Sequence, residues 1–179
     1  QLVTEKFYST AAAETIDVKV WLPKDYDSNK SYPVIYEFVY DQSDYIATTL
    51  NHLYQCPSAI VVHADFYPET SYEKPTLSAK GEKYYQFVKD ELLPSIEKKY
   101  KTLHRTATGL SQGADYVNYI LRTNPELFDA YMIFAIESPN YQADFAAYTD
   151  KIDAEKDYFI AIANDVERRI KFANELYEN

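Results

Sequence analysis

The sequence is short of glycine and cysteine, and each shortage limits what the chain can be. Only three of the 179 residues are glycine, and two of them fall within five residues of each other. Cys56 is the only cysteine, which excludes an internal disulfide and leaves the redox compartment open. No apolar run approaches the roughly 18 residues of a membrane-spanning helix. Disulfide-rich and membrane-spanning classes are therefore excluded.

Positive charge is also scarce. The chain has 18 Lys and Arg residues against 28 Asp and Glu residues, a formal net charge of -10. We expect neither a nucleic-acid partner nor an anionic membrane partner, because neutralising phosphates requires clustered cations. Apolar residues make up 46% of the chain, enough for a sizeable core. These values predict one domain spanning residues 1–179.

Hydrophobic patterns predict an α/β fold. Strands are predicted at residues 5–8, 16–22, 34–40, 59–63, 106–109, 130–136 and 158–163, and helices at residues 45–54, 81–100, 112–121 and 166–177. Pro94 lies inside the second helix and is expected to kink it. Strands alternate with helices from residue 34 onward, which predicts a mainly parallel sheet with helices on both faces.

Two of the three glycines flank one serine in the pentapeptide Gly109-Leu110-Ser111-Gln112-Gly113. A predicted strand ends at Gly109 and a predicted helix follows Ser111, which is typical of a nucleophile elbow. Such a turn holds the serine in a strained conformation and lifts its hydroxyl above the sheet edge. Helix N–H groups then point to where an oxyanion would form. The alternative is an ordinary strand-to-helix connection in which serine is the N-cap.

Three blocks of sequence, together spanning most of residues 16–140, carry a resemblance to a known family. The blocks are Val20–Tyr26 with Tyr32–Tyr36, Lys83–Thr102, and Arg105–Pro139. In them the chain resembles the esterases of the α/β-hydrolase superfamily, the group of esterase D-like and siderophore (enterochelin-type) esterases. The resemblance implies an α/β-hydrolase-like fold and a serine hydrolase that acts on a small-molecule carboxylic ester without a cofactor.

The resemblance also implies roles for single residues. Ser111 would be the nucleophile, and the backbone N–H of Gln112 would be one oxyanion donor. A second donor would come from the loop near Tyr40 and Asp41, where the family usually has a glycine and this chain has none. Asp165, just after the last predicted strand, would be the acid of the triad. Its alternative role is to cap the helix that follows.

The general base is the missing part of this triad. In this fold the order is serine, acid, histidine, but no histidine follows His104, and we expect the given sequence to lack the C-terminal strand and histidine loop. His104 precedes the strand into the elbow and belongs at the opposite edge of the sheet. His63 ends its strand at the correct edge, but one strand would separate it from Ser111, about 10 Å at ~4.8 Å per strand. We therefore assign His63 to the substrate cleft.

Two functions from different classes remain open. One is a serine ester hydrolase whose C-terminal segment lies outside the given sequence. The other is a non-catalytic, hydrolase-like binding module that lacks the triad histidine. The intact elbow favours the enzyme. We expect no metal site, because the spacing of His63, Asp65 and Glu69 matches no strong ligand motif.

The two ends of the chain give the last expectations. The chain starts at Gln1, so an N-terminal segment was removed or the boundary is engineered. A cleaved signal peptide would fit a secreted or periplasmic protein. An uncovered last strand would leave a sheet edge exposed, which predicts pairing with another chain, as in a homo-oligomer.

Overall fold

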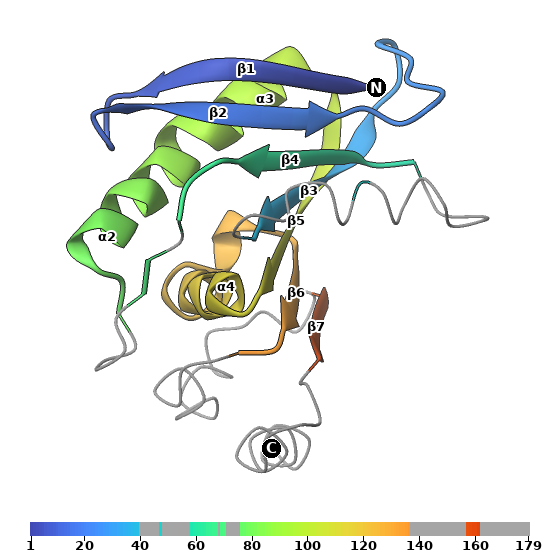
Figure 1. Cartoon of the computed structure of the whole chain (residues 1–179). Coiled ribbons are helices and arrows are strands. Elements are labelled where there is room, and N and C mark those ends of the chain that lie inside the picture. The colour runs from blue at the N-terminus through green and yellow to red at the C-terminus, as the bar shows by residue number, and fades with distance from the viewer. Residues whose placement is uncertain (40–46, 48–57, 68, 71–75, 137–156, 162–179) are drawn as a thin grey trace.

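A computed structural model describes residues 1–39, 47, 58–67, 69–70, 76–136 and 157–161, the last segment by its backbone (Figure 1). A seven-stranded sheet organises these residues, with the strand order β1-β2-β4-β3-β5-β6-β7. The strands are β1 (Leu2–Ser9), β2 (Glu14–Trp21), β3 (Tyr32–Phe38), β4 (Ile60–Ala64), β5 (Thr102–Leu110), β6 (Ala130–Phe134) and β7 (Asp157–Ala161).

The sheet is mainly parallel, as predicted. Strands β4, β3, β5, β6 and β7 run parallel to one another. The β1–β2 hairpin extends the sheet, since β2 pairs antiparallel with both β1 and β4. All five parallel strands therefore end at one edge of the sheet, and in open α/β sheets this carboxyl edge is where ligands bind.

The helix predicted at residues 81–100 consists of three consecutive segments. They are α2 (Ala79–Gln86), the π-helix η1 (Phe87–Leu92) and α3 (Leu93–Lys99). Pro94 lies in the first turn of α3, where its missing N–H is tolerated. The wider turn lies just before it, where the N–H of Leu93 donates to Val88 O, five residues back. The predicted kink is thus a π-helical turn that precedes the proline.

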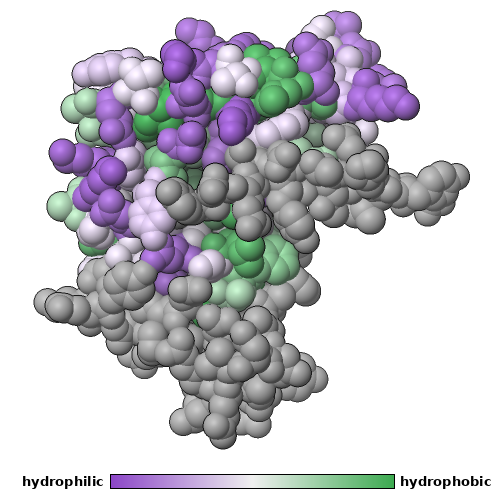
Figure 2. Space-filling model, viewed as in Figure 1, coloured by the Kyte–Doolittle hydropathy of each residue, from purple (hydrophilic) through white to green (hydrophobic). Residues whose placement is uncertain are grey.

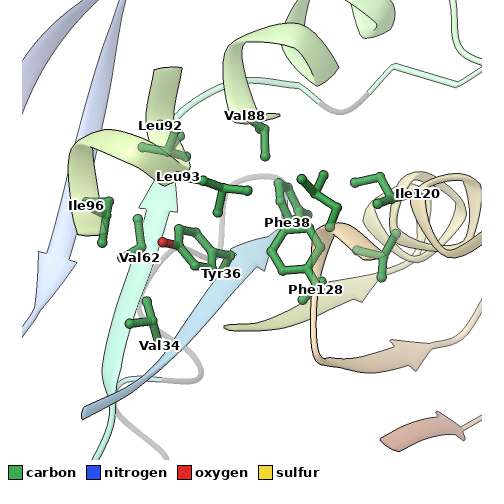
Figure 3. Packing of buried hydrophobic residues seen from close by; sticks show 14 of the residues in the cluster. Val34, Tyr36, Phe38, Val62, Val88, Leu92, Leu93, Ile96, Ile120 and Phe128 are labelled. Atoms are coloured by element: carbon green, nitrogen blue, oxygen red, sulfur yellow. The ribbon is translucent and has the colours of Figure 1, made fainter. Parts of the chain in front are cut away.

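One face of the sheet carries the main core (Figure 3). Strand β3 alternates, so that Val34, Tyr36 and Phe38 point to this face and are buried. Side chains from η1, α3 and the helix α4 (Gln112–Thr123) pack against them, with Leu93 and Ile120 fully buried. Burying each such side chain contributes roughly 1.5–3 kcal/mol.

Some predicted elements lie outside the described residues. They include nearly all of the predicted helix at 45–54, of which only Ala47 is described, as helical and buried, and the whole predicted helix at 166–177. The short 3-10 helix η2 (Pro125–Leu127) follows α4. Among the described helices, none is long and apolar enough to cross a membrane.

Candidate active site

Ser111 is the single residue between β5 and α4. Its backbone has a φ of 59° and a ψ of -124°, a conformation that non-glycine residues adopt only under strain. The strained geometry predicted for Ser111 is therefore present. Ser111 occupies the N-cap position by sequence, but its side chain makes no capping hydrogen bond, and an N-cap serine normally has an extended backbone. The alternative of an ordinary serine N-cap is wrong.

The two elbow glycines are required by close contact between backbones. A Cβ atom on Gly113 would lie 1.7 Å from the carbonyl oxygen of Phe38, at the end of β3. A Cβ atom on Gly109 would lie 2.2 Å from the carbonyl oxygen of Gly113. Both distances are far inside van der Waals contact, so only glycine fits at either position. The first turn of α4 therefore rests directly on the carboxyl ends of β3 and β5.

Main-chain hydrogen bonds fix the turn on both sides. The N–H of Ser111 donates to Phe134 O on β6 at 3.1 Å, and Ser111 O accepts from Ala114 N at 2.9 Å and from Asp115 N at 3.2 Å. Since α4 begins with Gln112, the N–H groups of its first turn lie at the positive end of the helix dipole. Negative charge that develops beside Ser111 is favoured there.

The predicted oxyanion donors are only partly described. Gln112 is the first residue of α4, as its assigned role requires. Tyr40 and Asp41 lie outside the described residues, as does Asp165. The contact of Gly113 with Phe38 brings the end of β3 against the start of α4, so the chain leaves β3 next to the elbow. The assigned roles of these residues stay predictions.

His63 lies near the carboxyl end of β4 and is only 3% exposed. Its Nδ1 atom is 3.3 Å from Glu37 O, and the two residues are register partners on β4 and β3. Strand β3 therefore separates His63 from β5, as predicted. Burial lowers the pKa of His63, partly opposed by nearby Asp65 and by the hydrogen bond to Glu37, so the neutral imidazole is favoured. Its role in a substrate cleft stays a prediction.

Of the other two histidines, the structure describes only His104. His104 is exposed and near the amino end of β5, at the edge opposite Ser111, as predicted. His52 lies outside the described residues. Among the residues with described placement, no group of three His, Cys, Asp or Glu side chains could hold a metal ion. His63, Asp65 and Glu69 therefore do not form such a group.

Two features beside the elbow were not predicted. Ala135 has a φ of 54° and directly follows Phe134, whose carbonyl accepts the hydrogen bond from Ser111. Two strained residues thus flank one hydrogen bond, and such strain is frequent at functional sites. Leu110, just before Ser111, is 37% exposed although it is a large apolar residue. The exposure of Leu110 could have been predicted from its position beside Ser111. Nothing in the sequence predicts a positive φ for an alanine.

The strand order, the carboxyl-edge serine and the strained turn together define a protein of the α/β-hydrolase class. A scan against family models matches residues 9–159 to the family described as "Putative esterase". Because the match spans most of the chain, the chain belongs to this esterase family and is a carboxylic ester hydrolase. A comparison with functionally curated proteins found no match.

Solved structures agree with this assignment. An IroE-like serine hydrolase from Shewanella oneidensis is 25% identical with a TM-score of 0.84, and the match covers 99% of this chain and 69% of that one. A ferulic acid esterase is 20% identical with a TM-score of 0.76, covering 99% and 85% of the two chains. The siderophore hydrolase EstB from Aspergillus nidulans is 15% identical with a TM-score of 0.66, covering 99% and 81%. The last two likenesses show the fold alone.

Proposed function

We propose that this esterase works through an acyl-enzyme formed on Ser111. The observation that carries the proposal is the strained elbow, in which Ser111 has positive φ and its hydroxyl is not used as a helix cap. This costly turn is packed so closely that only glycine fits at positions 109 and 113, and it has a clear use if it presents a nucleophile.

The chemistry follows from the position of Ser111. Its Oγ atom attacks the ester carbonyl carbon, its proton passes to a general base, and the carbonyl oxygen becomes an oxyanion. The N–H of Gln112, at the start of α4, stabilises that oxyanion together with a donor near Tyr40 and Asp41. The tetrahedral intermediate collapses, and the alcohol leaves with the proton. Water then attacks the acyl-serine, and the carboxylic acid is released.

The general base does not come from the described histidines. His63 is separated from β5 by β3, and His104 lies at the other edge of the sheet. We infer that Asp165, which follows β7 along the chain, is the acid, in keeping with the order of serine, acid and histidine typical of this fold. A histidine that accepts the serine proton would complete the triad.

A fluorophosphonate probe tests the proposal directly, because it reacts with a serine only when a base activates it. We expect labelling of the full-length protein at Ser111, no labelling of its Ser111→Ala variant, and full labelling of its Ser31→Ala variant, in which an exposed serine outside the site is replaced. Hydrolysis of p-nitrophenyl acetate should fall by roughly 10³-fold or more in Ser111→Ala.

Two results would contradict the proposal. One is a folded chain that hydrolyses activated esters equally well with and without Ser111. The other is a folded, full-length protein that neither reacts with the probe nor hydrolyses any activated ester, which would instead support a binding module built on the hydrolase fold.

A further inference from the structure

A second candidate site lies away from the elbow, between the turn of the β1–β2 hairpin and the first turns of α2. A pocket of about 380 Å³ opens there, a volume within the range of small-molecule sites, roughly 300–1,000 Å³. Its lining residues are Ala12, Glu14, Ala79, Lys80, Lys83 and Tyr84. Strands β4 and β3 lie between β2 and the elbow strand β5, so this pocket is separate from Ser111.

The α2 wall of the pocket is held in place by several contacts. The ring of Tyr84 stacks on Phe66 with centroids 4.5 Å apart, and its hydroxyl donates a hydrogen bond to Glu14 across the pocket. A Cβ atom on Gly81 would lie 2.0 Å from the carbonyl oxygen of Glu69, so the start of α2 rests directly on that backbone. The α2 side is therefore preformed, which lowers the entropic cost of binding.

The hairpin wall is also held. The carboxylate of Glu91, in η1, accepts hydrogen bonds from the backbone N–H groups of Thr10 at 3.1 Å and Ala11 at 3.0 Å. These residues form the turn that leads to Ala12 and Glu14. Both walls of the pocket therefore have fixed positions before any ligand arrives.

The lining combines two cations with hydrogen-bonding groups. Lys80 and Lys83 are three residues apart on α2 and so share one face of the helix. The ammonium of Lys80 is 3.8 Å from a carboxylate oxygen of Glu69, whereas Lys83 makes no ion pair with any residue that the structure describes. Figure 2 shows hydrophilic residues over the side of the molecule where the hairpin meets α2.

This chemistry indicates the class of ligand. Lys80 is offset by Glu69, so Lys83 is the cation of this pocket that favours an anion. The Glu14 carboxylate accepts hydrogen bonds and repels a second anionic group, so it suits ligand hydroxyls. We propose that the pocket binds a small hydroxy acid, whose carboxylate contacts Lys83 and Lys80 and whose hydroxyls contact Glu14 and Tyr84.

Calorimetric titration with a matched pair of probes tests this proposal. Glucuronate and glucose have similar size and hydroxyl groups, but only glucuronate carries a carboxylate. We expect saturable binding of glucuronate at or below about 10 mM and at least tenfold weaker binding of glucose. Because both lysines are at the surface, the affinity for glucuronate should fall as salt is raised.

Variants assign the binding to this pocket. Lys83→Ala should weaken glucuronate binding at least fivefold, and Lys98→Ala, an exposed lysine at the end of α3, should leave it unchanged. Ser111→Ala should also bind normally, so failure at the elbow and failure here are distinguishable. The proposal is overturned if glucuronate does not bind in this range, if glucose binds equally well, or if Lys83→Ala binds as the unmodified chain does.

Discussion

At the scale of single residues, Ser111 has a strained backbone with positive φ, and its proposed role as nucleophile explains why the strain is kept. A non-glycine residue in such a conformation costs on the order of 1–3 kcal/mol. The hydrogen bond from the N–H of Ser111 to Phe134 O holds the turn against β6, so the strain cannot be relieved without breaking that bond. The strain therefore lowers the free energy of unfolding at the residue that presents the hydroxyl.

Replacing Ser111 should separate strain from chemistry. Ser111→Gly removes the Cβ atom and should raise the free energy of unfolding by about 1 kcal/mol, after the entropy that glycine gains in the unfolded chain. Ser111→Ala keeps the Cβ atom and serves as the control, because it removes the hydroxyl without relieving the backbone. Urea unfolding of the two variants gives the comparison, and equal stabilities would show that the turn is not strained.

The residues of the candidate site differ in how well the sequence predicts them. The strained turn at Ser111 could be predicted because two of the three glycines surround it at a change from strand to helix. Asp165, Tyr40 and Asp41 depended on resemblance alone, and their placement stays untested. The positive φ of Ala135 could not be predicted, since it arises from how the chain leaves β6 and not from any local preference of alanine.

At the scale of elements, Glu91 joins two segments that are distant in sequence. One of its carboxylate oxygens holds the turn after β1 through two backbone N–H groups, and the residue belongs to the π-helix η1. Sequence periodicity cannot show such a contact, because a π-helical turn shifts the residues that follow relative to a regular helix. The proline indicated only that the helix would be irregular near this place.

Removing the Glu91 carboxylate should loosen the hairpin. Hydrogen bonds to charged groups contribute about 1.5–3 kcal/mol, so Glu91→Ala should lower the free energy of unfolding by about 2 kcal/mol. Glu82→Ala, an exposed glutamate on α2, is the matched control and should change it by less than about 0.5 kcal/mol. Hydrogen exchange at Thr10 and Ala11 should also accelerate in Glu91→Ala, and unchanged exchange there would refute the assigned contact.

At the scale of the whole molecule, the mainly parallel sheet could be predicted because strands and helices alternate from residue 34 onward. The position of His63 followed from the strand order, and the structure confirms that β3 lies between β4 and β5. The extent of β5 was underestimated, since Thr102–Arg105 contains the exposed residues Leu103 and His104 and does not have the pattern of a buried strand. Tertiary pairing with β3 overrides that local signal.

Burial of His63 should make the stability of the whole fold depend on pH. Burial lowers its pKa below the ordinary value of 6.5, while Asp65 and the hydrogen bond to Glu37 act in the opposite direction. The unfolded chain therefore binds a proton more readily, so stability is complete above pH 6.5 and decreases as pH falls toward the folded-state pKa. The slope should reach at most about 1.4 kcal/mol per pH unit.

Urea unfolding between pH 7.5 and about pH 5.5 should show this slope in His104→Gln, the exposed control, and a flatter one in His63→Gln. Equal slopes in the two variants would mean that another group is responsible.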